Sequence, residues 1–324
     1  MREEAGQSGY FAGVGFHAVS GRELVVLGTA SQAPTRHRNH NGYLLRWDGF
    51  GILFDPGEGT QRQMVLAGVA SSAIDMICVT HLHGDHCLGL PGVLARMSLD
   101  GRPAEVEIMF PAPSQPEMAV LLDFAVGRRS VVPLPRPCRA GVVCEGPPLR
   151  VSAAALDHGV PTLGWRVEEP AGRTMDRAAL ERAGITGRAV GRLIAEGRLV
   201  TSGGTVSLED MSVPRRGQSF AFIMDSRPCE AALRLAEGVD LLVCESTFLR
   251  RDEALARQYR HMTAAEAATL AVEAGARKLV LSHFSQRYPD ESVLAAEAAE
   301  IHADVVAARD LDVVAFPGRS DNGR

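Results

Sequence analysis

The sequence lacks the features that mark membrane and secreted proteins. No stretch approaches the roughly 18 apolar residues that a membrane-spanning helix requires, and Met1-Arg2-Glu3-Glu4 is not followed by the apolar segment of a secretory signal. Lysine is almost missing, since Lys278 is the only one among the 34 basic residues, and the net charge of −5 gives no overall basic field. An anionic partner would therefore have to be held by a local patch or by metal ions. We expect neither secretion nor membrane insertion.

The six cysteines lack the spacing of a zinc finger, because no two of them form a C-x2-C or C-x4-C pair. Cys78 and Cys244 lie inside apolar runs, where a free thiol behaves as a small buried hydrophobe. Free, buried thiols are typical of a reducing compartment. The cysteine pattern therefore predicts a cytoplasmic protein.

What the chain does contain is an alternation of strand-like and helical patterns. With 324 residues, of which 46% are hydrophobic, it can bury a full core. A loose leader is expected over residues 1–21 and an Arg- and Gly-rich insertion at about 171–203; the rest predicts an α/β fold. Strands are expected at 23–27, 42–47, 51–55, 75–80, 105–110, 149–157, 162–168, 218–224, 240–244, 277–282 and in a closing pair near 304–316. Helices are expected near 58–68, 86–98, 114–125, 228–237, 263–274 and 290–302.

Four potential metal ligands fall within the six residues His81-Leu82-His83-Gly84-Asp85-His86. They follow an apolar run, and neither a continuing strand nor a helix would point all four side chains the same way. A tight turn that opens into a helix allows them to converge, and Gly84 supplies the backbone freedom. The alternative is four solvated polar residues in a loop. Imidazole suits zinc, iron or nickel, and a carboxylate can be shared by two ions.

Three more residues of ligand type follow apolar runs, namely His158, Asp225 and His283. If the runs are parallel neighbouring strands, these residues share one rim of the sheet with the His81–His86 cluster. Each residue alone could be an ordinary loop residue. Seven ligands exceed one tetrahedral zinc and suit two ions that share a carboxylate and keep a position open for water. Such a pair of ions is typical of hydrolysis, including displacement at phosphorus.

With these residues in place, the chain resembles the metallo-β-lactamase superfamily and, within it, the ribonuclease Z family from about Glu23 to Pro317. The resemblance rests on the His-x-His-x-Asp-His signature and on three further segments. These are Phe54-Asp55-Pro56-Gly57-Glu58-Gly59-Thr60-Gln61-Arg62-Gln63, Gly89-Leu90-Pro91-Gly92 and His283-Phe284-Ser285-Gln286-Arg287-Tyr288.

The resemblance implies a fold, a reaction and partners. The fold would be a four-layer αβ/βα sandwich, a single domain over 22–324 with a flexible arm inserted at about 171–203. The reaction would be removal of the 3' trailer from precursor tRNA by hydrolysis, leaving a tRNA 3' hydroxyl. It would require two Zn²⁺ per chain, with Mn²⁺ or Fe²⁺ as possible substitutes. A cytoplasmic homodimer, in which each arm serves the partner's site, is also implied.

Roles for single residues follow from the same resemblance. His81, His83 and His158 would hold one ion and Asp85, His86 and His283 the other, with Asp225 bridging and Asp85 also acting as general base. Glu245 and His261 would together protonate the departing 3' oxygen of the tRNA. The residues themselves agree in part, because Thr263-x-x-Glu266 is a capping box that places His261 just before a helix. The alternatives are a strand-end carboxylate paired with an arginine for Glu245, and a surface histidine for His261.

Two basic segments would contact the substrate. Pro34-Thr35-Arg36-His37-Arg38-Asn39 resembles a family loop near the site, so Arg36, Arg38 and Asn39 would bind RNA. The 171–203 insertion has six arginines against three acidic residues, hence a net charge of +3, which suits an arm that grips phosphates. Its arginines are Arg173, Arg177, Arg182, Arg188, Arg192 and Arg198. Both segments could instead be solvated surface.

The sequence departs from the family pattern in places. Ser226 follows Asp225 where the family has Thr, Cys244 replaces a His, Met262 replaces a Ser, and the arm lacks its Gly-Pro signature. None of these changes removes a proposed ligand.

The metal core alone does not exclude a hydrolase of a small phosphodiester, ester or lactone, which is the alternative function. A non-catalytic RNA-binding or metal-storage module is a third. The arm, the His261/Glu245 pair and the 34–39 loop favour the tRNA nuclease, because a small substrate needs none of them.

Overall fold

The computed structural model describes residues 21–101, 105–123, 130–146 and 149–319, so the leader expected over 1–21 lies almost wholly outside the described residues. The chain divides into two compact units. One comprises the residues up to Val167 together with Ser219–Gly318, and the other comprises Glu168–Gln218 with the C-terminal residues from Arg319. Within the described ranges, no helix is long and apolar enough to cross a membrane.

The larger unit is built on two seven-stranded sheets. The first has the order β18-β1-β2-β3-β4-β5-β6, in which β3 to β6 are parallel. Its strands are β1 (Arg22–Gly28), β2 (Gly42–Trp47), β3 (Phe50–Phe54), β4 (Met76–Cys78), β5 (Glu105–Pro111), β6 (Val132–Cys138) and β18 (Val313–Ala315). The second has the order β17-β16-β15-β14-β9-β8-β7, in which β14 to β17 are parallel. Its strands are β7 (Gly141–Gly146), β8 (Leu149–Ala155), β9 (Leu163–Glu168), β14 (Ser219–Ile223), β15 (Leu241–Glu245), β16 (Lys278–Ser282) and β17 (Val305–Ala307).

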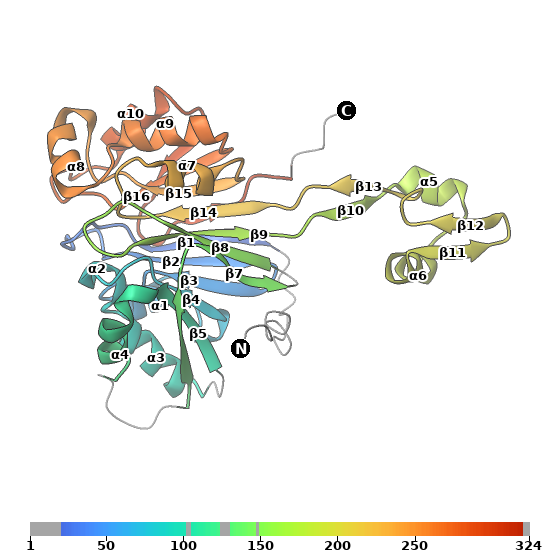
Figure 1. The fold of residues 1–324 in the computed structure, drawn as a ribbon, viewed down its shortest axis with the longest axis horizontal. Coiled ribbons are helices and arrows are strands. Elements are labelled where there is room, and N and C mark those ends of the chain that lie inside the picture. Colours follow the sequence, from blue (N-terminus) through green and yellow to red (C-terminus); the bar gives the residue numbers. More distant parts are fainter. Residues whose placement is uncertain (1–20, 102–104, 124–129, 147–148, 320–324) are drawn as a thin grey trace, which may run out of the picture. The chain divides into compact units, whose positions relative to one another are not determined.

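The two sheets face each other, and helices cover their outer faces (Figure 1). Apolar side chains of both sheets, such as Tyr43, Phe54 and Phe222, form the central core. A second core lies between the first sheet and α1 (Thr60–Leu66), α3 (Leu90–Leu99) and α4 (Gln115–Asp123). A third lies between the second sheet and α7 (Glu230–Ala236), α9 (Ala264–Ala274) and α10 (Ser292–Ala299). The expected four-layer αβ/βα sandwich is confirmed.

Several elements differ from the sequence expectation. The single helix expected near 86–98 is two helices, α2 (Gly84–Cys87) and α3. Between them, the backbone at Gly89 packs closely against the loop that contains Gly57. A Cβ atom there would lie 1.9 Å from the Gly57 carbonyl oxygen. Strands β6 and β7 and helix α8 (Glu253–Tyr259) were not expected. The proline-rich β6 and the largely exposed β7 lack the apolar runs by which the other strands were recognised.

The smaller unit has its own fold. It contains β10 (Gly172–Met175) paired with β13 (Ser212–Arg215), β11 (Arg198–Thr201) paired with β12 (Gly204–Ser207), and helices α5 (Arg177–Arg182) and α6 (Arg188–Glu196). Leu180, Ile185, Leu193 and Leu199 form a small buried cluster. The insertion expected at about 171–203 lies inside this unit, which continues to Gln218.

Candidate metal centre

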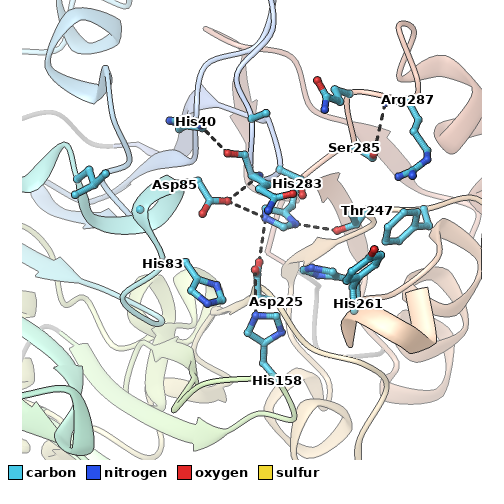
Figure 2. A pocket seen from close by; sticks show the side chains of 18 residues that line it. His40, His83, Asp85, His158, Asp225, Thr247, His261, His283, Ser285 and Arg287 are labelled. Carbon is cyan, nitrogen blue, oxygen red and sulfur yellow. Dashed lines mark hydrogen bonds and ion pairs between the residues drawn. The ribbon is translucent and has the colours of Figure 1, made fainter. Parts of the chain in front are cut away.

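Loops at the carboxyl ends of strands from both sheets supply the candidate ligands. The His81–His86 segment follows β4 in the first sheet, whereas Asp225 and His283 follow β14 and β16 in the second. His158 follows β8, which β9 separates from β14. The arrangement considered from the sequence, in which the ligands follow parallel neighbouring strands of one sheet, is therefore wrong. The site lies where the edges of two facing sheets meet. All seven candidate ligands nevertheless come together. Figure 2 shows His83, Asp85, His158, Asp225 and His283 around the site.

Asp225 lies between two groups of histidines. Its Oδ2 is 3.5 Å from His81 Nε2 and 3.6 Å from His158 Nε2. Its Oδ1 is 3.4 Å from His86 Nε2 and 3.1 Å from His283 Nε2. One carboxylate thus turns one oxygen toward each group, as a bridge between two ions requires.

The remaining ligands complete the two groups. His83 Nδ1 is 2.9 Å from His81 Nε2, and the ligand atoms of His81, His83, His158 and Asp225 lie within 4.8 Å of one another. Asp85 Oδ2 is 3.3 Å from His86 Nε2 and 3.5 Å from His283 Nε2, which makes the second group. The division is the same as the one implied by the resemblance.

Unusual backbone angles aim these side chains. Asp225 has φ of 46° and His283 has φ of 61°, in the left-handed region that costs a residue with a side chain about 1 kcal/mol or more. His283 comes directly after the buried strand β16, and Asp225 comes two residues after the end of the buried strand β14; the side chains of both point into the site (Figure 2). The packed strands hold a geometry that the isolated chain would avoid.

The unmet bonding capacity of these residues fits divalent metal ions. His158 Nε2, Asp225 Oδ1 and His283 Nε2 are buried atoms without a hydrogen-bond partner among the described residues. Such atoms are costly unless a ligand satisfies them. Burial lowers the pKa of His81 well below its ordinary value, so its ring is neutral and has a free lone pair. Burial alone would raise the pKa of Asp225, but His283, His86 and His81 hold it well below its usual range. The lowered pKa of His81 and the ionised carboxylate of Asp225 suit a zinc-like ion, which binds imidazole nitrogen and carboxylate oxygen.

A buried acid–base pair lies beside the metal ligands. His261 Nδ1 is 2.9 Å from Glu245 Oε1, and Glu245 is wholly buried. The amides of Ser226 and Met262 and the hydroxyl of Thr247 also donate to this carboxylate. Burial alone would lower the pKa of His261, but Glu245 and Asp225 outweigh it and raise that pKa to about 9. Glu245 thus favours the protonated form of His261, which suits this residue to act as an acid.

The helix behind His261 begins as the sequence predicts. The Thr263 hydroxyl accepts from the Glu266 amide, and the Glu266 carboxylate accepts from the Thr263 amide, which confirms the capping box. Met262 and Cys244, two of the departures from the family pattern, contact each other: Cys244 Sγ is 3.8 Å from Met262 Sδ, and both residues are buried. The two departures thus form one sulfur contact behind the Glu245/His261 pair.

Comparison with known proteins identifies the family. Ribonuclease Z of Streptomyces coelicolor is 52% identical over 305 residues, which are 93% of this chain and 100% of that protein. Ribonuclease Z of Chlamydia muridarum is 40% identical over 300 residues, or 92% of this chain and 99% of that protein. The chain belongs to the ribonuclease Z family. A β-lactamase superfamily domain model also matches residues 205–284, and a model described as anti-Pycsar protein Apyc1 matches residues 22–119.

Solved structures agree on the fold. The metallo-β-lactamase fold protein YhfI from Bacillus subtilis has a TM-score of 0.66 at 17% identity, over 90% of this chain and 98% of that one. Human tRNase Z, short form, has a TM-score of 0.65 at 23% identity, over 91% of this chain and 99% of that one. This ribonuclease Z family member is therefore a metal-dependent endoribonuclease with the metallo-β-lactamase fold.

A cavity of about 910 Å³ opens at the candidate metal ligands. His83, Asp85, His158, Asp225, His261 and His283 line it, as Figure 2 shows. His40, Thr247, Phe248, Tyr259 and Arg287 also line it, and the sequence analysis assigned none of them a role.

The predicted substrate residues of the 34–39 loop are placed differently from one another. Arg38 is buried, and its guanidinium donates to the Tyr288 carbonyl and pairs with Glu291 at 2.9 Å. Asn39 donates to the carbonyls of His40 and Glu58. These contacts fit a structural role for both residues better than RNA contact. Arg36 is exposed, although it does not line the cavity.

Asp55 is a supporting residue that the sequence analysis did not single out. Its wholly buried carboxylate lies 2.8 Å from His86 Nδ1 and accepts from the Thr80 amide and hydroxyl, both at 2.7 Å. The Thr80 hydroxyl is in turn 3.1 Å from His81 Nδ1. Asp55 thus orients one histidine of each ligand group, because a ring whose Nδ1 is held presents its Nε2 to the ion.

We predict that Asp55→Ala weakens metal binding by about 10- to 100-fold, the usual cost of losing a carboxylate that orients a ligand. Titration against a competing chelator would measure this. Asp75→Ala is the matched control, because Asp75 precedes β4 and its carboxylate accepts from the Gly51 amide. The control should lower stability without changing metal affinity. Equal affinity loss in both variants would show that Asp55 acts only through folding.

Proposed function

We propose that this chain removes the 3' trailer from precursor tRNA by hydrolysing one phosphodiester bond, and that it leaves a 3' hydroxyl on the tRNA. The observation that carries the proposal is the position of Asp225 between two groups of candidate ligands, next to the hydrogen-bonded pair of His261 and Glu245. Membership in the ribonuclease Z family supplies the substrate class. We propose zinc as the metal and two ions per chain, held by His81, His83 and His158 on one side of Asp225 and by Asp85, His86 and His283 on the other.

Divalent ions bound there would act as Lewis acids that lower the pKa of a water molecule and neutralise charge on the phosphate. The chain's own residues handle the protons. Asp85 accepts the proton of the attacking water at its carboxylate, which the Gln32 amide fixes with a 2.8 Å hydrogen bond to Oδ2. Asp85 is half-buried and lines the cavity, so water can reach it.

His261 supplies the other proton. As the bond between the water oxygen and phosphorus forms and the bond from phosphorus to the tRNA 3' oxygen breaks, His261 donates its proton to that oxygen. The Glu245 carboxylate stabilises the protonated ring before transfer and fixes its orientation. The products are a tRNA with a 3' hydroxyl and a trailer with a 5' phosphate.

The remaining partners extend the same proposal. The smaller unit, Glu168–Gln218, would act as the arm that binds the body of the tRNA through its arginines, and the exposed Arg36 would contact RNA nearer the site. We further propose a cytoplasmic homodimer in which each arm serves the partner's site. Light scattering of the purified protein would measure that stoichiometry, and a monomer that cleaves at full rate would contradict it.

The decisive test is cleavage of a 3'-extended precursor tRNA by a preparation whose metal content is measured. We predict one cut after the last nucleotide of the mature tRNA, complete loss of cutting after chelation, and recovery with Zn²⁺. Metal analysis should give two ions per chain. A metal-replete sample that leaves the precursor intact but turns over a small ester would overturn the proposed function.

A further inference from the structure

The cavity is also lined by side chains that take no part in the metal cluster. Phe248, Tyr259 and Arg287 line it together with His261. Tyr259 is 53% exposed, whereas every other aromatic residue in the part of the chain that the structure describes is buried or half-buried. An exposed ring at the mouth of a nuclease cavity is available to a ligand, and a nucleobase is the flat apolar group that an RNA substrate offers.

The backbone around Tyr259 is fixed to the metal site. Tyr259 is the last residue of α8, and Arg260 ends that helix in the left-handed region, with φ of 59°. The Arg260 guanidinium donates to the His158 carbonyl at 2.8 Å, and the His261 amide donates to the Ala256 carbonyl. The ring of Tyr259 is therefore attached to a segment that contacts one metal-ligand loop and carries the His261 acid.

Arg287 also lines this cavity and carries a positive charge. It is exposed and has no acidic partner among the described residues, and its guanidinium lies 5.7 Å from the centre of the Phe248 ring. In contrast, Arg257 and Arg251 nearby pair with Glu253 and Asp252. In Figure 2, Arg287 is on the side of the cavity where Thr247 and His261 lie. A guanidinium without a carboxylate partner suits a phosphate.

We propose that Tyr259 and Arg287 form a nucleotide subsite for the last residue of the tRNA, in which Tyr259 stacks on the base and Arg287 contacts a backbone phosphate. This rests on the proposed function. The side of the cut follows from the chemistry: His261 gives its proton to the oxygen of that last nucleotide, and Tyr259 is two residues from His261. Stacking depends little on base identity, so the subsite would accept any of the four bases.

The test pairs enzyme variants with altered RNA. Tyr259→Ala should raise KM for the precursor by about 5- to 150-fold, the range for losing one base–aromatic stack, while Tyr259→Phe keeps the ring and the affinity. On a precursor that lacks the base of its last tRNA nucleotide, wild type and Tyr259→Ala should have the same KM. Arg287→Ala should raise KM equally on both RNAs, because the phosphate remains.

Each outcome separates the subsite from the proposed function. The stacking would be overturned if Tyr259→Ala raised KM equally on the intact precursor and on the precursor that lacks the base of its last tRNA nucleotide. It would also be overturned if the rise in KM disappeared only when the base of the first trailer nucleotide was removed. Wild-type KM in Tyr259→Ala, with the wild-type enzyme cutting normally, would overturn the subsite and leave the function standing. Failure of the wild type to cut any precursor would overturn both. Thermal unfolding and metal content of each variant exclude a folding effect.

Discussion

Replacing His261 with alanine should slow precursor cleavage by about 10²- to 10⁴-fold, the range for loss of a general acid. The reason is the leaving group: the ribose 3' oxygen is a poor leaving group unless it is protonated as the bond to phosphorus breaks. A p-nitrophenyl phosphodiester leaves as a stable phenolate and needs no such proton, so its hydrolysis should fall far less. Single-turnover rates on the two substrates would measure the contrast.

Metal content distinguishes this role from a ligand role. The side-chain atoms of His261, Asp225 and His283 also lie within 4.8 Å of one another, so a metal-binding role for His261 has to be tested. His261→Ala should retain its full metal complement and lose activity mainly on RNA. Loss of metal together with an equal drop on both substrates would contradict the acid role. Adding Glu245→Gln to His261→Ala should slow precursor cleavage little further, because the two residues act as a unit.

The sequence singles out these candidate ligands because several of them share one local pattern. A buried strand ends, and a histidine or an aspartate follows within a few residues; Asp225 lies two residues after the end of β14, and His283 directly follows β16. Asp55 follows β3 by the same pattern and could have been recognised from it. Asp55 was missed as a supporting residue because the pattern identifies a strand end but cannot tell a residue that touches the ion from one that holds its ligand.

Contacts between distant segments are the part of the site that the sequence does not reveal. Arg38 was predicted to bind RNA because a basic loop beside a cation site suits phosphate. Its partners, the Tyr288 carbonyl and Glu291, lie about 250 positions away, and no local pattern reveals them. The meeting of two sheets at the site is of the same kind, since the pairing order of strands cannot be read from their periodicity. Tyr259 and Arg287 likewise line one cavity only in the folded chain.

Charge in the smaller unit shows how composition can mislead. The predicted insertion, 171–203, has a net charge of +3, but the whole of Glu168–Gln218 has eight arginines against seven acidic residues and so only +1. Several of these arginines are also engaged. Arg173 donates to Ser212, Arg177 pairs with Glu181 at 2.9 Å, and Arg192 pairs with Glu196 at 3.6 Å. What matters for RNA is therefore which guanidinium groups have no acidic partner.

Arg182, Arg188 and Arg198 meet that condition, since each is exposed and has no acidic partner among the described residues. We predict that replacing all three with alanine weakens precursor-tRNA binding by about 100-fold or more at low salt. The slope of the logarithm of the binding constant against the logarithm of the salt concentration should become shallower by about 2 to 3. Each lost phosphate contact reduces the magnitude of this slope by roughly 0.7 to 0.9. Hydrolysis of a small phosphodiester should be unchanged. Filter binding across a salt series would measure the first two quantities.

A matched pair of double variants separates specific contacts from bulk charge. The first double variant combines Arg182→Ala with Arg188→Ala, and the second combines Arg177→Ala with Arg192→Ala. Each removes two positive charges, one from α5 and one from α6. The first pair should weaken binding much more than the second, because Arg177 and Arg192 are already offset by a glutamate one turn away. Equal losses would mean that the net charge of the smaller unit, and not its uncommitted arginines, attracts the RNA. A loss on the small phosphodiester as well would point to misfolding, since these arginines belong to a separate compact unit with its own core.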